Sequence, residues 1–586
     1  MNQTAWELSE LMPEFETAAY TQRLEDIQKR LETFLMTYKT LNDDMSVDSF
    51  VQMMREKEQI QFSVFLVNLH AYLKNSQDTQ NEIVKKHLRQ ADELSTHVAN
   101  SLRYLHLWYI ALPKEKAYAF AKGMGEDSYV FYKKYDLGKY SLSASEEKII
   151  SLKDMNGSDF LQSLYDGICS KFSFDFDGKK QSLTQMRKYL TDDSREKRRD
   201  AASAIQQKFS DNMHILGDMY QAVIKDHIIE AVNIRGYEST LQVRTLSEDI
   251  SQKAVLSLFD AAKGANHIFQ KFFKLKQKVL GYDTLELYDT YAPIRLTEKE
   301  KVPYEKAMNT ILSAAERIDS SFSQKIRDLV KDGHVDSVFS EHKRGGAFNY
   351  GVGNGVKPFV FMQYLEEEDD MFTLAHEFGH AIHSSMSVDK SLYSSHSSIG
   401  IAESASTFME EMVMDEILQT ASNRKKIELL FQQILSAYQT IQRQIYISIF
   451  EQQAHEKISN GTTNSELHSI WTDLQKEQFA DSVHIPNTLQ SWSYIPHIYH
   501  TPFYCYNYGV GLILAMLLYE KRTENPDTFA ELYKKYLRIS GSAGTVETAK
   551  EMGIDLEDAN TWKKGFDVIA QKVSVLESLC KEEGLM

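Results

Sequence analysis

The sequence predicts a mainly α-helical fold on three observations. Apolar residues recur at spacings of three and four along most of the chain, which is the period of one helix face. Proline is scarce, with nine in 586 residues, and none lies between Pro113 and Pro293, so long helices can run without interruption. The 26 glycines are also few for this length, and turn-rich β architectures need more of both residues.

The helical period predicts the elements in order along the chain. The first apolar stripe consists of Leu24, Ile27, Leu31, Phe34, Tyr38 and Leu41. The same spacing predicts helices within residues 51–110, 185–235, 250–280, 303–332, 404–460, 510–537 and 556–582. Ser143 and Glu146 have the spacing of a capping box, which predicts the start of a further helix.

The helical spacing of apolar residues is absent from residues 333–365. Gly345 and Gly346 interrupt the segment, and the residues that follow are rich in aromatic and branched side chains. This composition predicts short β-strands at Ala347–Tyr350 and Phe359–Tyr364. We therefore expect a small sheet immediately before the helix that starts near residue 368.

Length and local composition suggest two domains. A chain of this size has room for several domains of roughly 150 residues. Thr191–Arg199 is charged and turn-prone, which predicts a boundary between residues 1–195 and residues 196–586.

The overall charge and the cysteines exclude several classes of protein. The formal net charge is −17, which disfavours general binding of nucleic acid because that needs a basic face. The three cysteines form no CxxC pair, so they predict neither a zinc ribbon nor a disulfide framework. The first residues lack a basic and an apolar signal region, and no apolar run reaches about 18 residues. We expect a cytoplasmic protein without a membrane partner; nothing in the sequence predicts an oligomeric state.

The segment Met371–His383 contains the pattern H-E-x-x-H. On a helix, His376 and His380 lie on one face, so both imidazoles can bind one metal ion. Glu377 lies about 100° further round the helix, beside the ion, where it can take a proton from a metal-activated water. Two histidines leave a tetrahedral Zn²⁺ short of one protein ligand and one water.

The third ligand has to come from elsewhere. The metzincin pattern is excluded because the chain has His383 and Met386 where that pattern needs glycine and histidine. A carboxylate on a second helix is the remaining common solution. Glu403 is the best candidate, because it lies among small apolar residues on a predicted helix. Glu410, two turns further on the same face, can support a ligand histidine without binding the metal itself. For Glu410 and Glu411, an ordinary solvated position is an equal alternative.

These motifs resemble peptidase family M3. The resemblance rests on His-Glu-Phe-Gly-His-Ala-x-His, followed 23 residues after the second histidine by Glu-x-x-Ser-x-x-x-Glu. Within the family the oligoendopeptidase F branch fits best, because Trp6–Leu11 and Ser141–Ser170 are similar to its N-terminal region. Many relatives have Pro-Ser after the glutamate, whereas this chain has Ala405 and Ser406; we expect no effect from this difference.

The resemblance implies a fold, a cofactor and an activity. It implies two helical lobes around a deep substrate channel, with residues 1–195 as an oligoendopeptidase-F-like N-terminal domain and residues 196–586 as the catalytic domain. His376, His380 and Glu403 would bind one Zn²⁺, and Glu377 would be the general base. The partners would be short peptides, cleaved at internal bonds.

A second constellation lies at Ile495–Gly509, which holds two histidines and four tyrosines. Such side chains donate hydrogen bonds without needing a full charge, which suits the stabilisation of an oxyanion. Family M3 has a matching His/Tyr loop that faces the zinc. The first choices for this role are His497 and Tyr504, and the alternates are His500, Tyr506 and Tyr508.

The strand at Pro358–Tyr364 also has a functional interpretation. If it is an exposed edge strand, it can pair with an extended peptide through main-chain hydrogen bonds. An ordinary covered strand is the alternative.

Two other functions stay open at this point. One is an exopeptidase of the dipeptidyl carboxypeptidase type on the same scaffold, which needs a cationic group for the substrate's terminal carboxylate. The other is a non-catalytic helical protein that binds peptides. The ligand types also permit Co²⁺ or Mn²⁺ in place of Zn²⁺.

Overall fold

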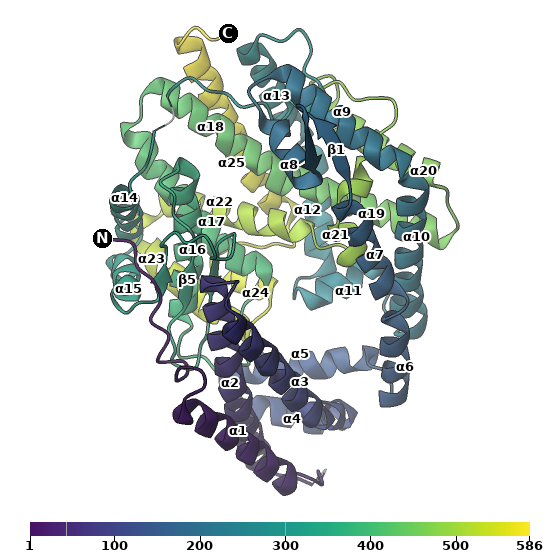
Figure 1. The fold of residues 1–586 in the computed structure, drawn as a ribbon, viewed down its shortest axis with the longest axis vertical. Helices are drawn as coiled ribbons and strands as arrows, with labels where there is room; N and C mark the ends of the chain where they lie inside the picture. Colours follow the sequence, from purple (N-terminus) through teal and green to yellow (C-terminus); the bar gives the residue numbers. More distant parts are fainter. Residues whose placement is uncertain (43, 299) are drawn as a thin grey trace. The chain divides into compact units, whose positions relative to one another are not determined.

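The computed structural model describes residues 1–42, 44–298 and 300–586, and helices dominate it (Figure 1). This confirms the predicted mainly α class. None of the helices in these described ranges combines the length and the apolarity that a membrane crossing requires. The chain folds into two compact units, and each unit is assembled from three separate stretches of sequence. The boundary at residues 195/196 and the deep channel stay predictions.

The first unit comprises Met1–Lys139, Glu300–Ile417 and Lys521–Met552. Its helices are α1 (Ala18–Thr37), α2 (Val47–Gln77), α3 (Glu82–Ala111), α4 (Lys114–Gly123), α5 (Ser128–Leu137), α14 (Tyr304–Glu316), α15 (Ser320–Lys331), α16 (Glu368–Met386), α17 (Ile399–Thr420, whose last turn crosses into the second unit), α23 (Pro526–Ile539) and α24 (Thr545–Lys550). Its strands are β3 (Val335–Asp336), β4 (Phe348–Tyr350) and β5 (Phe359–Phe361).

The second unit comprises Tyr140–Lys299, Leu418–Glu520 and Gly553–Met586. Its helices are α6 (Ala144–Asp154), α7 (Ser158–Ser170), α8 (Leu183–Lys188), α9 (Arg195–Asp211), α10 (Met213–Ile228), α11 (Thr240–Ser247), α12 (Gln252–Gly264), α13 (Asn266–Leu280), α18 (Asn423–Ala437), α19 (Arg443–Ser459), α20 (Asn464–Phe479), α21 (His497–His500), α22 (Tyr506–Glu524, which extends into the first unit) and α25 (Ala559–Glu582). A hairpin of β1 (Ser173–Phe176) and β2 (Lys179–Ser182) completes it.

The helix starts follow from local chemistry. The predicted capping box opens α6, where the Ser143 backbone N–H donates to Glu146 at 2.9 Å and the Ser143 hydroxyl accepts from the Glu146 N–H. Glu367 and Asp370 form a similar box at the start of α16. The carboxylates at this end of α16 also suit the positive end of its dipole.

The three-stranded sheet has the order β3-β5-β4. β5 pairs in parallel with β3 and antiparallel with β4, and all three of its residues are buried. Of the two alternatives for Pro358–Tyr364, the structure therefore has the covered strand and not the exposed edge, because Phe359–Phe361 form the middle of the sheet. Both sides of β5 are hydrogen-bonded to neighbouring strands, and its side chains are buried by packing on the faces of the sheet, by Trp6 and by α16. β3 and β4 form the two edges of this sheet, and the residues of β4 are only partly buried.

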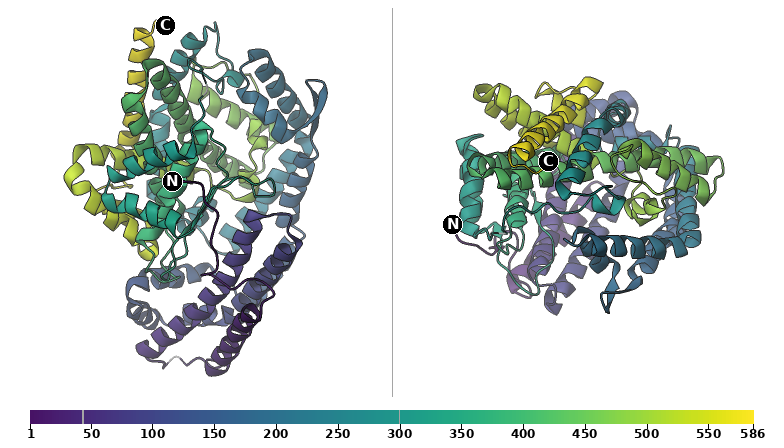
Figure 2. Two further views of the ribbon diagram at one scale, coloured as in Figure 1. Left: turned by 60° about the vertical axis from the view of Figure 1, so that its left-hand side comes forward. Right: turned by 90° about the horizontal axis from the view of Figure 1, so that it is seen from above.

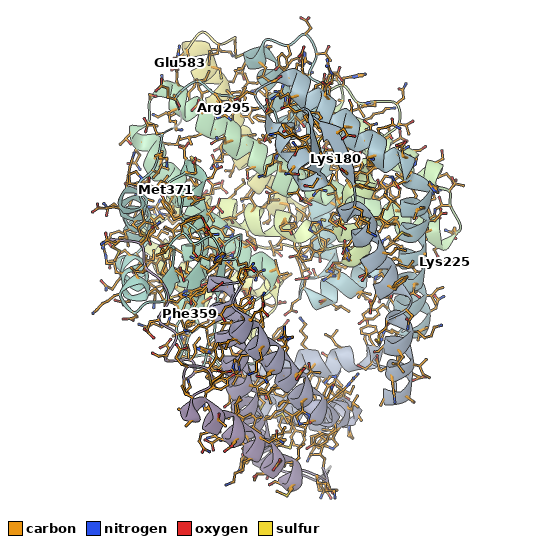
Figure 3. All side chains as sticks on the ribbon, in the orientation of Figure 1. Lys180, Lys225, Arg295, Phe359, Met371 and Glu583 are labelled. Carbon is orange, nitrogen blue, oxygen red and sulfur yellow. The ribbon has the colours of Figure 1, made fainter. Side chains whose placement is uncertain are left out.

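The N-terminal segment covers the sheet, and the left view of Figure 2 shows it in dark purple. The indole of Trp6 lies 5.1 Å from the ring of Phe361 and donates a hydrogen bond to the carbonyl of His334. α16 packs against β4 and β5; Met371 on this helix and Phe359 on β5, both labelled in Figure 3, are buried. The sheet thus forms a fixed support for α16.

A buried ion pair fixes the loop between β3 and β4. The Lys343 ammonium lies 2.6 Å from the Asp336 carboxylate and donates to the carbonyls of Val338 and Met362. Asp336 also accepts from the Gln77 amide at 2.7 Å. Because both charges are buried and fully hydrogen-bonded, removing one partner leaves the other uncompensated.

We predict that Lys343→Met lowers the stability of the first unit by about 3–5 kcal/mol, since it leaves the Asp336 charge buried without a cation. The matched control is Lys357→Met. Lys357 contacts Asp332 at the same 2.6 Å, but both side chains are at least two-fifths exposed, so we expect a loss of about 0–1 kcal/mol. Thermal and urea unfolding of the two variants measure the difference, and equal losses contradict this role of burial.

Candidate metal centre and active site

Three side chains from two helices converge in the first unit. His376 and His380 project from one face of α16, and Glu403 projects from α17. Their nearest ligand atoms all lie within 4.8 Å of one another. The Glu403 Oε2 atom lies 3.5 Å from His376 Nε2 and 3.7 Å from His380 Nε2. The structure thus brings together the three residues predicted as metal ligands.

These separations fit a shared ion. Zinc binds nitrogen and oxygen ligands at about 2.0–2.2 Å, which places the donors of a tetrahedral site about 3.3–3.5 Å apart. The same separations are too long for ordinary N–H···O hydrogen bonds. Two imidazole nitrogens and one carboxylate oxygen form a donor set that suits Zn²⁺.

The close approach of α17 to α16 depends on Gly379. A Cβ atom at this position would lie 2.5 Å from the Ala405 carbonyl oxygen and 2.5 Å from the Ser406 Cα. No real Cβ atom tolerates such distances from backbone, so only glycine permits this packing. Glu403 lies within one helical turn of the contact, and it reaches the two histidines because the helices meet here. The sequence motif contained this glycine, but spacing alone did not reveal its role.

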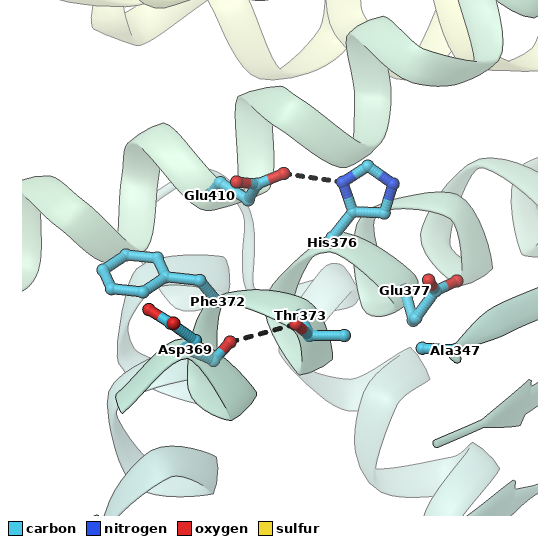
Figure 4. Close-up of a pocket in the computed structure, with 7 residues that line it drawn as sticks. All are labelled: Ala347, Asp369, Phe372, Thr373, His376, Glu377 and Glu410. Carbon is cyan, nitrogen blue, oxygen red and sulfur yellow. Dashed lines mark hydrogen bonds and ion pairs between the residues drawn. The ribbon is translucent and has the colours of Figure 1, made fainter. Parts of the chain in front are cut away.

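Neighbouring groups orient the three predicted ligands. The Glu410 carboxylate accepts from the Nδ1 of His376 at 2.6 Å (Figure 4). This contact leaves the Nε2 on the side of Glu403. His380 hydrogen-bonds the backbone of Ala402. The Ser406 hydroxyl lies 3.2 Å from Glu403 Oε2 and donates to it. Such supporting contacts fix ring orientation and ligand direction. The predicted supporting contact of Glu410 is therefore present, whereas Glu411 is buried and does not line the pocket described below.

The electrostatics of His376 reflect this arrangement. Burial alone would lower its pKa, but the hydrogen bond to Glu410 and the charges of Glu410, Glu403 and Glu377 raise the pKa to about 9. The carboxylates thus make a strongly negative environment around the two imidazoles, which attracts a cation.

Glu377 is buried beside the histidines, with 6% of its surface exposed. Its carboxylate accepts the backbone N–H of Asn349 on β4, while its Oε2 atom has no partner in the described structure. Burial raises the pKa of Glu377 to about 7, partly opposed by the His376 charge and reinforced by Glu403 and Glu410. An unpartnered buried carboxylate oxygen needs an explanation, and proton transfer in an active site supplies one. The sequence did not single out Asn349, since a backbone N–H carries no residue-type signal.

A pocket of about 420 Å³ opens beside these groups (Figure 4). Its lining consists of Ala347, Asp369, Phe372, Thr373, His376, Glu377 and Glu410. The pocket therefore connects the end of the β4 edge with the histidine face of α16. A bound molecule can place its reacting group and a neighbouring group of its own together in such a pocket.

The residues predicted at Ile495–Gly509 lie in the second unit, and the structure separates them into groups. The rings of His497, Tyr504 and Tyr508 cluster, with centroids 5.4–6.2 Å apart. His500 instead directs its Nε2 to Asp166 at 3.0 Å. Tyr506 is buried against Phe259. The structure thus brings together three of the five candidates, and a catalytic role for any of them stays a prediction.

Comparisons with known proteins bear on the whole chain. Residues 188–568 match the model of peptidase family M3. The chain belongs to peptidase family M3. It is therefore a metallopeptidase, and the predicted resemblance is confirmed.

Relatives and solved structures agree over nearly the full length. The chain is 26% identical over 587 residues to an oligoendopeptidase F homolog of Borreliella burgdorferi, with 98% of each chain covered. It is 23% identical to the oligopeptidase PepF of Bacillus subtilis, covering 98% of this chain and 87% of the relative.

Two solved structures share the fold. Oligoendopeptidase F from Enterococcus faecium matches with a TM-score of 0.70 at 20% identity, covering 96% of this chain and 98% of that chain. A protein from Chlamydophila abortus matches with a TM-score of 0.87 at 23% identity and 98% coverage of both chains.

We predict that Gly379→Ala lowers the affinity for Zn²⁺ by about 10–100-fold, because the new methyl group pushes α17 and Glu403 away from the histidines. Competition with a chromophoric chelator measures the affinity. Gly264→Ala is the control, since a Cβ at that exposed helical position meets no atom within 4 Å. Unchanged affinity in Gly379→Ala would show that the contact does not set the position of Glu403.

Proposed function

We propose that this chain is a zinc-dependent oligoendopeptidase that hydrolyses internal bonds of short peptides. The observation that carries the proposal is the convergence of His376, His380 and Glu403 around one point, with the unpartnered carboxylate oxygen of Glu377 beside it. Zn²⁺ bound by these residues would act as a Lewis acid and would lower the pKa of a water molecule beside Glu377. The names of the oligoendopeptidase F relatives support short peptides as the substrates.

Glu377 performs the proton transfers in this proposal. Its carboxylate takes the proton of the attacking water and later delivers it to the leaving amine. The Asn349 N–H holds one part of this carboxylate, which leaves the Oε2 atom to receive the proton. Glu410 keeps His376 in the tautomer whose Nε2 is available as a ligand.

The free edge of β4 suits the main chain of an extended substrate. The Val360 N–H donates to the carbonyl of His334, the residue immediately before β3, so the main-chain groups of Val360 face β3. Since Asn349 pairs with Val360 in the antiparallel register, its own main-chain groups face away from β5, toward Glu377. Ala347, two residues earlier, lines the pocket. A peptide that adds to this edge would bind through its backbone, which tolerates many sequences.

His497, Tyr504 and Tyr508 are the donors that we assign to the developing oxyanion. Their N–H and O–H groups are neutral and clustered, and such donors stabilise negative charge that develops in a transition state. His500 was predicted for the same task, and its hydrogen bond to Asp166 favours a structural role.

The test uses an internally quenched peptide of about ten residues, blocked at both ends. We expect internal cleavage by the wild type that a chelator abolishes and Zn²⁺ restores. Glu377→Gln should lower kcat by about 10²–10⁴-fold, since it removes the general base, while the bound zinc is retained. Product masses and metal content by atomic emission provide the two readouts.

Glu368→Gln, in the first turn of the same helix and outside the pocket lining, is the control and should retain activity. If the protein removes terminal residues from an unblocked peptide but does not cleave the blocked peptide, the exopeptidase alternative is established. Peptide binding without turnover in the zinc-loaded protein would establish the non-catalytic alternative and refute the proposal.

A further inference from the structure

A strained turn precedes Tyr504 in the second unit. Thr501, Pro502, Phe503 and Tyr504 form a β-turn, because the Tyr504 N–H donates to the Thr501 carbonyl at 3.1 Å. Phe503, the third residue of the turn, has a φ of 58°. A positive φ at this position, after proline, is typical of a type II turn, where glycine or asparagine is preferred. A bulky aromatic residue is unfavourable in this left-handed region, so other contacts must hold the turn.

Two side chains from separate helices supply those contacts. The Glu451 carboxylate on α19 accepts the Phe503 N–H at 2.7 Å. The Arg244 guanidinium on α11 donates through its Nε to the Pro502 carbonyl at 3.1 Å. These two groups belong to the same peptide unit, the central one of the turn. Its orientation is what distinguishes a type II turn from a type I turn, in which Phe503 would have an unstrained φ near about −90°.

The environment of Glu451 shows that this contact is specific. Glu451 is 0% exposed, and its Oε2 atom has no partner in the described structure. Burial raises the pKa of Glu451 to about 8, although the Phe503 N–H and the nearby Arg244 oppose the shift. Removing a carboxyl group from water costs free energy, so its presence here indicates a contact that an apolar side chain cannot make.

We propose that Glu451 and Arg244 are positioning residues that clamp the Pro502–Phe503 peptide and thereby hold in one conformation the turn from which Tyr504 joins the His497, Tyr504 and Tyr508 cluster. Without these two contacts the peptide can rotate and relieve the strain at Phe503, and the turn that carries Tyr504 is then no longer held in a single conformation. The Arg244 Cζ atom also lies 6.0 Å from the centre of the Tyr504 ring, so one of the two clamping residues is close to the side chain of Tyr504 itself. This inference rests on the proposed role of the cluster in catalysis.

The experiment compares Glu451→Leu with Glu451→Gln in the full-length, zinc-loaded enzyme on the blocked peptide. Glu451→Leu removes the acceptor, and we expect kcat to fall about 10–100-fold while KM and zinc content stay unchanged. Glu451→Gln keeps a carbonyl oxygen for the Phe503 N–H and should retain kcat within about threefold. Arg244→Met removes the other contact to the same peptide and predicts a similar fall in kcat, including where Glu451→Leu fails to fold.

Glu428→Leu is the matched control. Glu428 is also buried in the second unit and accepts the backbone N–H groups of Leu296 and Thr297, the latter at 2.7 Å, but it touches no residue of the turn in these contacts. Its loss should lower the melting temperature and leave kcat unchanged. A fall in kcat for Glu428→Leu equal to that for Glu451→Leu would reduce Glu451 to a general structural role.

A double-mutant cycle with Tyr504→Phe decides whether Glu451 acts through Tyr504. We expect the effect of Glu451→Leu on kcat to shrink in the Tyr504→Phe background, because the two changes remove one function. Fully additive effects overturn the inference while leaving the proposed function intact. If Tyr504→Phe, Tyr508→Phe and His497→Gln all retain wild-type kcat, the assigned role of the cluster fails, and the inference fails with it.

Discussion

The contact between α16 and α17 at Gly379 is the constraint on which the candidate site depends. A helix can place His376 and His380 on one face by its own geometry, but it cannot supply the third ligand. That ligand comes from a second helix, which has to approach to the distance at which only a glycine fits. The capping box of α16 and its packing against β4 and β5 hold the first helix in place. Glu403 then meets the histidines at separations suited to an ion rather than to hydrogen bonds.

Burial gives these groups their chemical character. Three carboxylates lie around two imidazoles in a partly desolvated space, and the pocket lining in the described structure includes no lysine or arginine. Charges in such surroundings interact more strongly than in water. In the proposed function, a divalent cation bound by His376, His380 and Glu403 would offset the negative charges of Glu403 and Glu410, and Glu377 would lie close enough to exchange protons. The same sheet edge that would receive the substrate backbone also orients Glu377 through Asn349. In the proposed function, the position of the substrate and the position of the general base would thereby be linked.

Much of this could be predicted from the sequence. The helical period gave the fold class, and the H-E-x-x-H spacing with a distant glutamate gave three residues that converge. The order of the strands could not be predicted, because an apolar run such as Phe359–Phe361 fits an edge and a centre equally well until its partners are known. The directions of His500 and Tyr506 also depend on tertiary contacts with Asp166 and Phe259. Arg244 and Glu451 gave no signal at all, since they are 258 and 52 residues from their partners in the turn.

Zinc X-ray absorption spectroscopy of the zinc-loaded protein can determine whether His376, His380 and Glu403 together bind one zinc ion. We expect nitrogen and oxygen ligands at about 2.0–2.2 Å, with two imidazoles among them. We also expect His380→Ala to lose one imidazole contribution and most of the bound metal. A sulfur atom at about 2.3 Å would assign the metal to a cysteine. That result, or an unchanged spectrum in His380→Ala, would rule out zinc binding by these three residues.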